Sequence, residues 1–295
     1  MYTSLISAAE LASHLDDPGW RVVDCRFSLA DSELGRRHYD EGHLPGAVYA
    51  HLDDDLAAPV GATTGRHPLP AAAEMVSRLE QWGVSSGAGE SGDSDTQVVV
   101  YDDCGGAIAV RLWWMLRWLG HPAAAVLDGG YSAWLAAGLP VTQEAPQIES
   151  GHFHVQPDDG RWCSVHELAG LLQRGECLLL DCRDSERYQG RVEPIDPVAG
   201  HVPGACNLPY IDNLDTHGRF KEPEVLRAMY ESLLDGRNPA EVVHMCGSGV
   251  TACHNLLAME IAGLPGSRPY PGSWSEWISN PARLVAGERS QESES

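Results

Sequence analysis

The stretch VVDCRF at Val22–Phe27 returns as LLDCRD at Leu179–Asp184, and this repetition decides the fold. In both copies a short apolar run ends in Asp-Cys-Arg. Two further motif pairs follow in the same order: His43-Leu-Pro-Gly-Ala47 with His201-Val-Pro-Gly-Ala205, and Gly130-Tyr-Ser-Ala-Trp134 with Ser273-Trp-Ser-Glu-Trp277. A motif order that repeats once along the whole chain predicts two domains of the same architecture.

Each half also shows the same order of secondary structure. A helix is expected after Ser7 and after Ser164, because each serine has a glutamate three residues on, as in a capping box. Short apolar strands at 97–101 and 241–245 run into glycine-containing loops, and helices follow at about 109–119 and 252–262. Strands that alternate with helices predict an α/β fold in which each domain has a mostly parallel sheet flanked by helices.

The chain length of 295 residues suits two domains of about 150 residues each. We predict a first domain at 1–142, a linker at 143–160, a second domain at 161–285 and a disordered tail at 286–295. The segment Ser85–Thr96, rich in Gly and Ser, makes the first half longer and is expected to be a flexible surface loop.

Composition excludes several classes of protein. A net charge of -22 argues against a nucleic-acid binder, which would show a basic patch. No apolar stretch reaches the roughly 18 residues of a membrane span, and no secretion signal is evident, so a cytoplasmic protein is expected. The eight cysteines form no CxxC pair and the histidines no HExxH, so we expect reduced thiols and neither a metal nor an organic cofactor.

Cys246 has the setting of a reactive thiol. It begins the stretch C-G-S-G-V-T between a predicted strand and a predicted helix. Loop N–H groups and the helix N-terminus present positive dipole ends that stabilise a thiolate or a persulfide, and Gly247 and Gly249 let the backbone curl around the sulfur. An inert buried cysteine is the alternative reading. An ungapped alignment of the halves pairs Cys246 with Asp103, so the first domain lacks this thiol.

Together, Asp-Cys-Arg, His-x-Pro-Gly-Ala and the six-residue Cys246–Thr251 loop resemble the rhodanese superfamily. The tandem arrangement, from about Ile6 to Trp277, is similar to the thiosulfate and 3-mercaptopyruvate sulfurtransferases. The uncharged loop resembles the mercaptopyruvate branch, since the thiosulfate branch carries basic residues there. The resemblance implies an enzyme that moves sulfur from a small-molecule donor to cyanide, a small thiol or thioredoxin through a persulfide on Cys246.

The resemblance also implies roles for other residues. Arg187 matches the arginine that binds the donor's carboxylate or sulfonate. A second family arginine is missing from Glu193-Pro194-Ile195-Asp196, and Arg191 is a candidate replacement. The remaining roles are a Ser/His/Asp proton relay across the domain interface, and a sulfur cradle made by the loop that follows Cys246. These involve Ser248, His67 and Asp53 for the relay, and Gly247, Gly249, Val250 and Thr251 for the cradle.

Two rival functions stay in view. A phosphatase of the same fold needs an arginine six residues after its cysteine, and this chain has Ala252 there. A catalytically silent rhodanese module used for binding is the second rival, and the presence of Cys246 with its whole loop argues against it. The choice between 3-mercaptopyruvate and thiosulfate as donor remains open at this point.

Overall fold

The computed structural model describes residues 1–87 and 95–287 and divides the chain into two compact units. The first unit comprises Met1–Ala58, Pro70–Asp159 and Thr216–Phe220, and the second comprises Pro59–Leu69, Gly160–Asp215 and Lys221–Ser295. Most of each unit is one half of the sequence, but each unit also takes in a short segment from the other half. The predicted first domain therefore includes a segment, Pro59–Leu69, that packs in the second unit.

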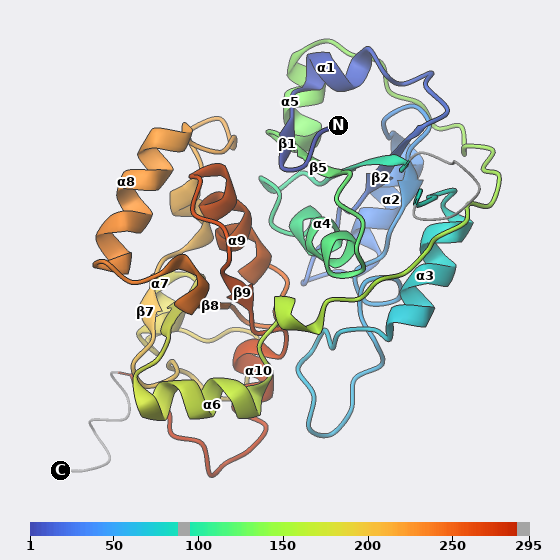
Figure 1. The fold of residues 1–295 in the computed structure, drawn as a ribbon. Coiled ribbons are helices and arrows are strands. Elements are labelled where there is room, and N and C mark those ends of the chain that lie inside the picture. The colour runs from blue at the N-terminus through green and yellow to red at the C-terminus, as the bar shows by residue number, and fades with distance from the viewer. Residues whose placement is uncertain (88–94, 288–295) are drawn as a thin grey trace. The chain divides into compact units, whose positions relative to one another are not determined.

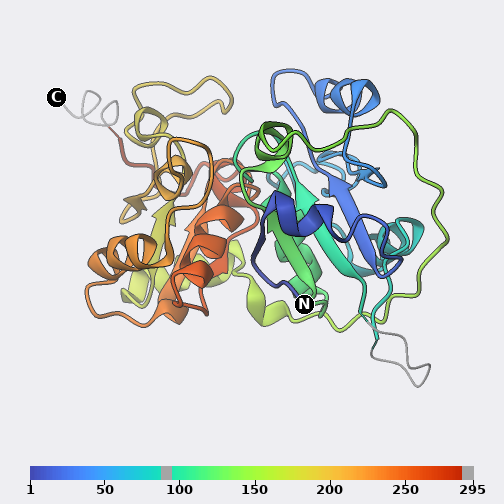
Figure 2. The same ribbon diagram turned by 90° about the horizontal axis from the view of Figure 1, so that it is seen from above.

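The first unit is built on a five-stranded parallel sheet with the order β1-β5-β4-β2-β3. Figure 2 shows its strands, coloured from blue to green, side by side. The central strand β4 is buried along its whole length, as expected for a parallel sheet covered on both faces. The strands are β1 Leu5–Ile6, β2 Trp20–Asp24, β3 Val48–Tyr49, β4 Gln97–Tyr101 and β5 Ala124–Leu127, and the helices are α1 Ala8–Ala12, α2 Leu34–Glu41, α3 Ala72–Gln81, α4 Ala109–Trp118 and α5 Gly130–Ala136.

The second unit has a four-stranded parallel sheet with the order β7-β6-β8-β9. Helix α9 packs against α8 and β8, and Figure 1 shows α8 and α9 together in this unit. The strands are β6 Leu178–Asp181, β7 Cys206–Asn207, β8 Val242–Met245 and β9 Arg268–Pro269; the helices are α6 Val165–Arg174, α7 Ser185–Tyr188, α8 Pro223–Leu234, α9 Ala252–Ile261 and α10 Ser273–Trp277, with 3-10 turns at Asp159–Arg161, Tyr210–Asn213 and Pro239–Glu241.

The two units repeat each other in detail, which confirms the predicted α/β fold. In each core, the first and last helices pack on one face of the sheet: α1 and α5 in the first unit, α6 and α10 in the second. Asp24 binds the Arg26 side chain at 2.6 Å, and Asp181 binds Arg183 at 2.7 Å. Such buried ion pairs order the chain where β2 and β6 end.

Both predicted N-caps are present in the structure, whereas most of the predicted linker is part of the first unit. Ser7 forms the predicted capping box with Glu10, and the Ser164 side chain accepts the Glu167 N–H. The linker prediction was wrong in one respect, because residues 143–159 belong to the first unit, where Gly151 N–H donates to the Glu80 carbonyl at 2.8 Å.

The other two segment predictions fall partly outside the structure. Ala286 pairs with His201 through two backbone hydrogen bonds, so the chain is ordered at the first residue of the predicted tail, while 288–295 lie outside the described residues. Residues 88–94 of the predicted flexible loop also lie outside them. None of the helices in the described part of the chain has the length and apolar character that crossing a membrane requires.

Candidate active site

The Cys246 side chain lies at the junction of β8 and α9 and is 4% exposed. Gly249 N–H donates to Cys246 Sγ at 3.1 Å. Gly249 has φ +81°, and a Cβ there would lie 2.0 Å from the Pro271 carbonyl oxygen, so only glycine fits. One of the predicted cradle amides thus contacts the sulfur. In the described chain, no hydrogen bond joins Sγ to the amides of Gly247, Val250 or Thr251.

The backbone of Cys246 is held by the residues that start α10. Cys246 N–H donates to Ser273 Oγ at 3.0 Å, and the Cys246 carbonyl accepts the Trp274 N–H at 3.0 Å. Ser275 N–H donates to the Gly247 carbonyl at 2.9 Å. With three backbone groups of the loop fixed in this way, the position of the thiol is set before any ligand arrives.

Two residues of the predicted proton relay are in contact. His67 Nδ1 lies 2.6 Å from Ser248 Oγ, and both side chains are buried. His67 belongs to the segment Pro59–Leu69 of the second unit, so the prediction that this pair crosses between domains was wrong. Asp53 is an exposed residue of the first unit, and partial desolvation by its surroundings raises the pKa of its carboxyl. Its part in a relay stays a prediction.

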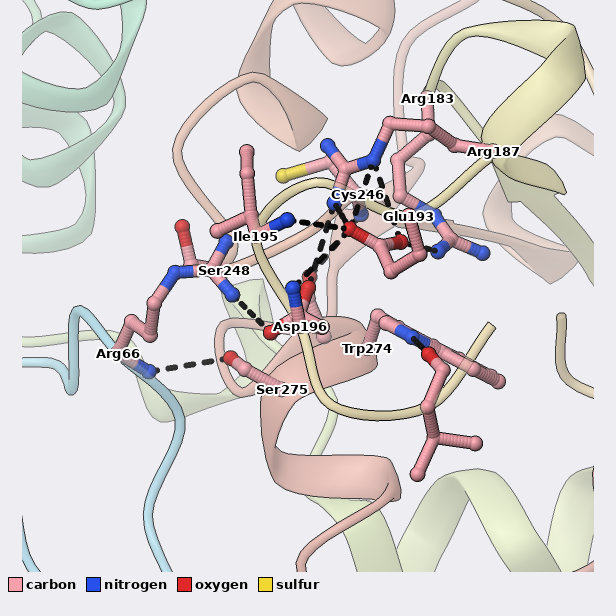
Figure 3. Close-up of polar contacts among 12 residues, drawn as sticks. Arg66, Arg183, Arg187, Glu193, Ile195, Asp196, Cys246, Ser248, Trp274 and Ser275 are labelled. Atoms are coloured by element: carbon pink, nitrogen blue, oxygen red, sulfur yellow. Dashed lines mark hydrogen bonds and ion pairs between the residues drawn. The ribbon is translucent and has the colours of Figure 1, made fainter. Parts of the chain in front are cut away.

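Arg187 lies beside the Cys246 loop and is held by a carboxylate. Its Nη2 donates to Glu193 at 2.7 Å and its Nε donates to the same carboxylate at 3.2 Å (Figure 3). Burial alone would raise the pKa of Glu193, but the bonds from Arg187 and from the Asp196 and Ile195 amides lower it below its usual range. Glu193 therefore holds the Arg187 guanidinium group in place next to Gly247, the residue that follows Cys246.

The amino-acid sequence of the two units identifies the family of the chain. The rhodanese-like domain family matches this chain twice, at residues 7–137 and 164–280. The chain belongs to the rhodanese family. Two matches, one in each half of the sequence, make it a tandem-domain rhodanese, and its relatives make it a sulfurtransferase.

Three relatives of this rhodanese cover nearly its whole length. A protein of Pseudomonas aeruginosa described as "Probable 3-mercaptopyruvate sulfurtransferase" is 48% identical over 284 residues, 96% of this chain and 97% of that protein. The thiosulfate sulfurtransferase of Bos taurus is 34% identical over 94% of this chain and 93% of its own. The crystal structure of a 3-mercaptopyruvate sulfurtransferase from Escherichia coli is 27% identical, with a TM-score of 0.79, over 93% of this chain and 100% of that one.

In the first rhodanese domain, Asp102 and not Asp103 stands at the position that Cys246 has in the second. Asp24 on β2 pairs with Tyr101, as Asp181 on β6 pairs with Met245, so the residues after β4 and β8 are Asp102 and Cys246. The prediction of Asp103 was wrong because helix α4 begins seven residues after Asp102, whereas α9 begins six after Cys246. An ungapped alignment cannot account for this extra residue.

Sequence reasoning also missed two members of the rhodanese site, Arg66 and Asp196. Asp196 forms one ion pair with Arg66. It forms a second ion pair with Arg187, whose Nη2 lies 3.3 Å from the carboxylate. The pKa of Asp196 is raised above its usual value, chiefly by burial. The charges of Arg66 and Arg187 lower this pKa and the charge of Glu193 raises it, but burial has the largest effect. The available signal was the position of Arg66 directly before His67, a predicted relay residue.

Proposed function

We propose that this sulfurtransferase takes sulfur from 3-mercaptopyruvate onto Cys246 as a persulfide and passes it to a thiophilic acceptor. The observation that carries the proposal is the Gly249 amide on Cys246 Sγ, beside the Arg187 cation that suits a donor carboxylate. A persulfide is also an anion, so the loop amides and the N-terminus of α9 would stabilise its outer sulfur.

The transfer proceeds in two halves. The Cys246 thiolate attacks the donor sulfur, so that an S–S bond forms and the carbon–sulfur bond breaks, with its electron pair passing to the enolate of pyruvate. A proton delivered along Ser248 and His67, with Asp53 as the predicted third member, turns the enolate into pyruvate. Cyanide or a thiol then attacks the outer sulfur and leaves Cys246 as the thiolate. Thiocyanate is the product when cyanide is the acceptor.

The charges around the site favour 3-mercaptopyruvate over thiosulfate. Glu193 and Asp196 lie against Arg187, and the Cys246–Thr251 loop itself has no charged residue. These two acidic groups offset much of the arginine charge, so a donor with one negative charge is accommodated better than the dianion thiosulfate. We therefore propose a higher kcat/KM for 3-mercaptopyruvate.

The setting is proposed to be reducing and cytoplasmic, with a small thiol or thioredoxin as acceptor. All eight cysteines are free thiols in the structure, and burial raises the pKa of Cys182 well above its ordinary value. Cys182 and the other buried cysteines are therefore poor competitors of Cys246 for the donor sulfur.

The test is steady-state turnover with each donor, with cyanide as acceptor, in the parent protein and in Cys246→Ser. We expect turnover with 3-mercaptopyruvate, a smaller kcat/KM for thiosulfate and none in Cys246→Ser. Cys206→Ser, at an exposed cysteine of the same unit, is the matched control and should keep full activity. A larger kcat/KM for thiosulfate contradicts the donor proposal. No turnover with either donor favours the binding module.

A further inference from the structure

The buried carboxylate of Asp196 joins two arginines that come from distant parts of the sequence. One oxygen pairs with Arg66 Nη1 and the other with Arg187 Nη2 at 3.3 Å, as Figure 3 shows. The Asp196 side chain is only 3% exposed. Arg66 arrives on the Pro59–Leu69 segment, and Arg187 belongs to α7 of the same unit.

Both guanidinium groups converge on the residue after the nucleophile. A Cβ built on Gly247 would lie 2.9 Å from Arg66 Nη2 and 3.7 Å from Arg187 Nη2. The two cations therefore lie side by side over the start of the Cys246 loop. A carboxylate bound beside these two guanidinium groups would meet nitrogen donors from both arginines, close to the residue that follows Cys246.

The hydrogen bonds already made leave donors for such a carboxylate. Arg66 uses Nη1 for Asp196, while its Nε is buried and has no hydrogen-bond partner within residues 1–87 and 95–287. A buried donor without an acceptor is unfavourable, so a carboxylate that binds at the Arg66 guanidinium group can supply an acceptor that the protein lacks there. Arg66 N–H also donates to Ser275 Oγ at 3.0 Å, which fixes the position of its backbone.

Resting on the sulfurtransferase function above, we propose that Arg66 is the second arginine that binds the donor carboxylate. It does the work of the family arginine that is missing after Glu193-Pro194. Asp196 holds Arg66 and Arg187 side by side, in the orientation that receives the two oxygens of an α-keto acid. Arg191, the replacement suggested by the sequence, has an exposed side chain, whereas Arg66 lies against the start of the Cys246 loop.

The experiment measures both half-reactions in Arg66→Ala, Arg66→Lys and Arg191→Ala. In Arg66→Ala we expect the KM for 3-mercaptopyruvate to rise about ten- to hundred-fold with a much smaller change in kcat, because the lost contact is made to donor and transition state alike. Arg66→Lys should lie between, since lysine keeps the charge without the planar fork. Arg191→Ala should match the parent.

Transfer from preloaded persulfide to cyanide should be unchanged in Arg66→Ala, since no carboxylate takes part in that half-reaction. Equal losses in both half-reactions, or an unchanged KM, overturn the proposal. A structural role for the Arg66–Asp196 pair would lower the melting temperature in Arg66→Ala without raising KM. If Arg66→Ala does not fold, Arg66→Lys carries the same comparison.

A binding measurement separates this inference from the proposed function. Calorimetry with pyruvate, the unreactive product, is made on Cys246→Ser and on Cys246→Ser with Arg66→Ala. A dissociation constant about ten-fold or more higher in the double variant supports the arginine pair even if turnover of 3-mercaptopyruvate fails. Equal pyruvate affinities in the two variants overturn the inference. The proposed function still holds in that case if the parent protein turns over 3-mercaptopyruvate. A Cys246→Ser protein that binds no pyruvate contradicts the arginine pair.

Discussion

Ser273 and Gly130 begin the last helices of their units with the same left-handed backbone, at φ +51° and +57°. A left-handed conformation is free for glycine but costs about 1–2 kcal/mol for serine. The Ser273 hydroxyl accepts the Cys246 N–H and donates to the Tyr270 carbonyl at 2.9 Å, and these two bonds offset the cost of the strained backbone. Backbone strain at this residue is thus coupled to the position of the nucleophile.

This strain leads to a prediction about Ser273→Gly and Ser273→Ala. Both variants lose the hydroxyl, but only glycine relieves the backbone, so Ser273→Gly should be more stable than Ser273→Ala by about 1 kcal/mol. Urea unfolding measures the difference. Ser275, in α10 without a positive φ, is the control: there the alanine variant should be the more stable. The same order at both positions would contradict the strain argument.

Single residues also show where sequence reasoning reached its limit. Cys246, Ser248 and Arg187 were predicted because they stand in local motifs, and the structure brings Ser248 to His67. Arg66 could not be inferred in this way, because its partner Asp196 is 130 residues away. Contacts at such separations follow from the fold, and no local pattern of charge reveals them.

The loop between β4 and α4 differs from the Cys246 loop in what fills it. The Asp102 carboxylate accepts N–H groups from four residues of the loop and helix start. These four amides converge on one carboxylate of the chain itself, whereas the Cys246 sulfur accepts a hydrogen bond from one loop amide, that of Gly249. The donors are Cys104, Gly106, Ile108 and Ala109, at 2.8–3.0 Å.

From this loop we predict opposite outcomes for two adjacent aspartates. Asp102→Ala leaves several buried N–H groups without an acceptor and should lower the free energy of unfolding by about 3 kcal/mol or more. The Asp103 side chain is exposed and has a long pair with His38 at 3.7 Å, so Asp103→Ala should change the free energy of unfolding by less than about 0.5 kcal/mol. Thermal and urea unfolding of both variants decide; equal effects would mean that Asp102 does not organise the loop.

The regular elements were largely predictable, because they depend on local pattern. The strand expected at 97–101 is β4 and the helix expected at about 252–262 is α9, which ends at Ile261. Alignment of the halves failed only within the loop that carries the chemistry, where the first unit has one extra residue. Helices and strands have a fixed period, but loops vary in length. An ungapped alignment of the two halves that is extended through a loop is therefore unreliable.

At the scale of the whole molecule, each unit contains a segment from the other half of the sequence. Pro59–Leu69 brings Arg66 and His67 into the unit of Cys246, and Thr216–Phe220 belongs to the first unit. In the first unit, Phe220 N–H donates to Asp128 at 3.0 Å. The two units are therefore distinct in packing but not in sequence, and the second half alone lacks part of its own site.

A divided chain tests this organisation. We expect a fragment that begins at Gly151 to turn over 3-mercaptopyruvate at least about ten-fold less efficiently than the full chain, because it carries Cys246 without Arg66 and His67. Circular dichroism and thermal unfolding establish whether the fragment folds. Addition of the fragment 1–150 should restore part of the activity. Full activity in a folded second fragment alone would show that the Pro59–Leu69 segment is dispensable.

The extra residue between Asp102 and α4 has a consequence for the descent of the two halves. If one ancestral domain was duplicated, a lone Asp102→Cys change would not return the first copy to activity. The new thiol would stand in a loop of the wrong length, stripped of the carboxylate that the surrounding amides bind. Reversal needs a deletion together with the substitution, and either change alone removes stability before any activity is gained. A single substitution at Asp102 would therefore not convert the first loop into a copy of the Cys246 loop.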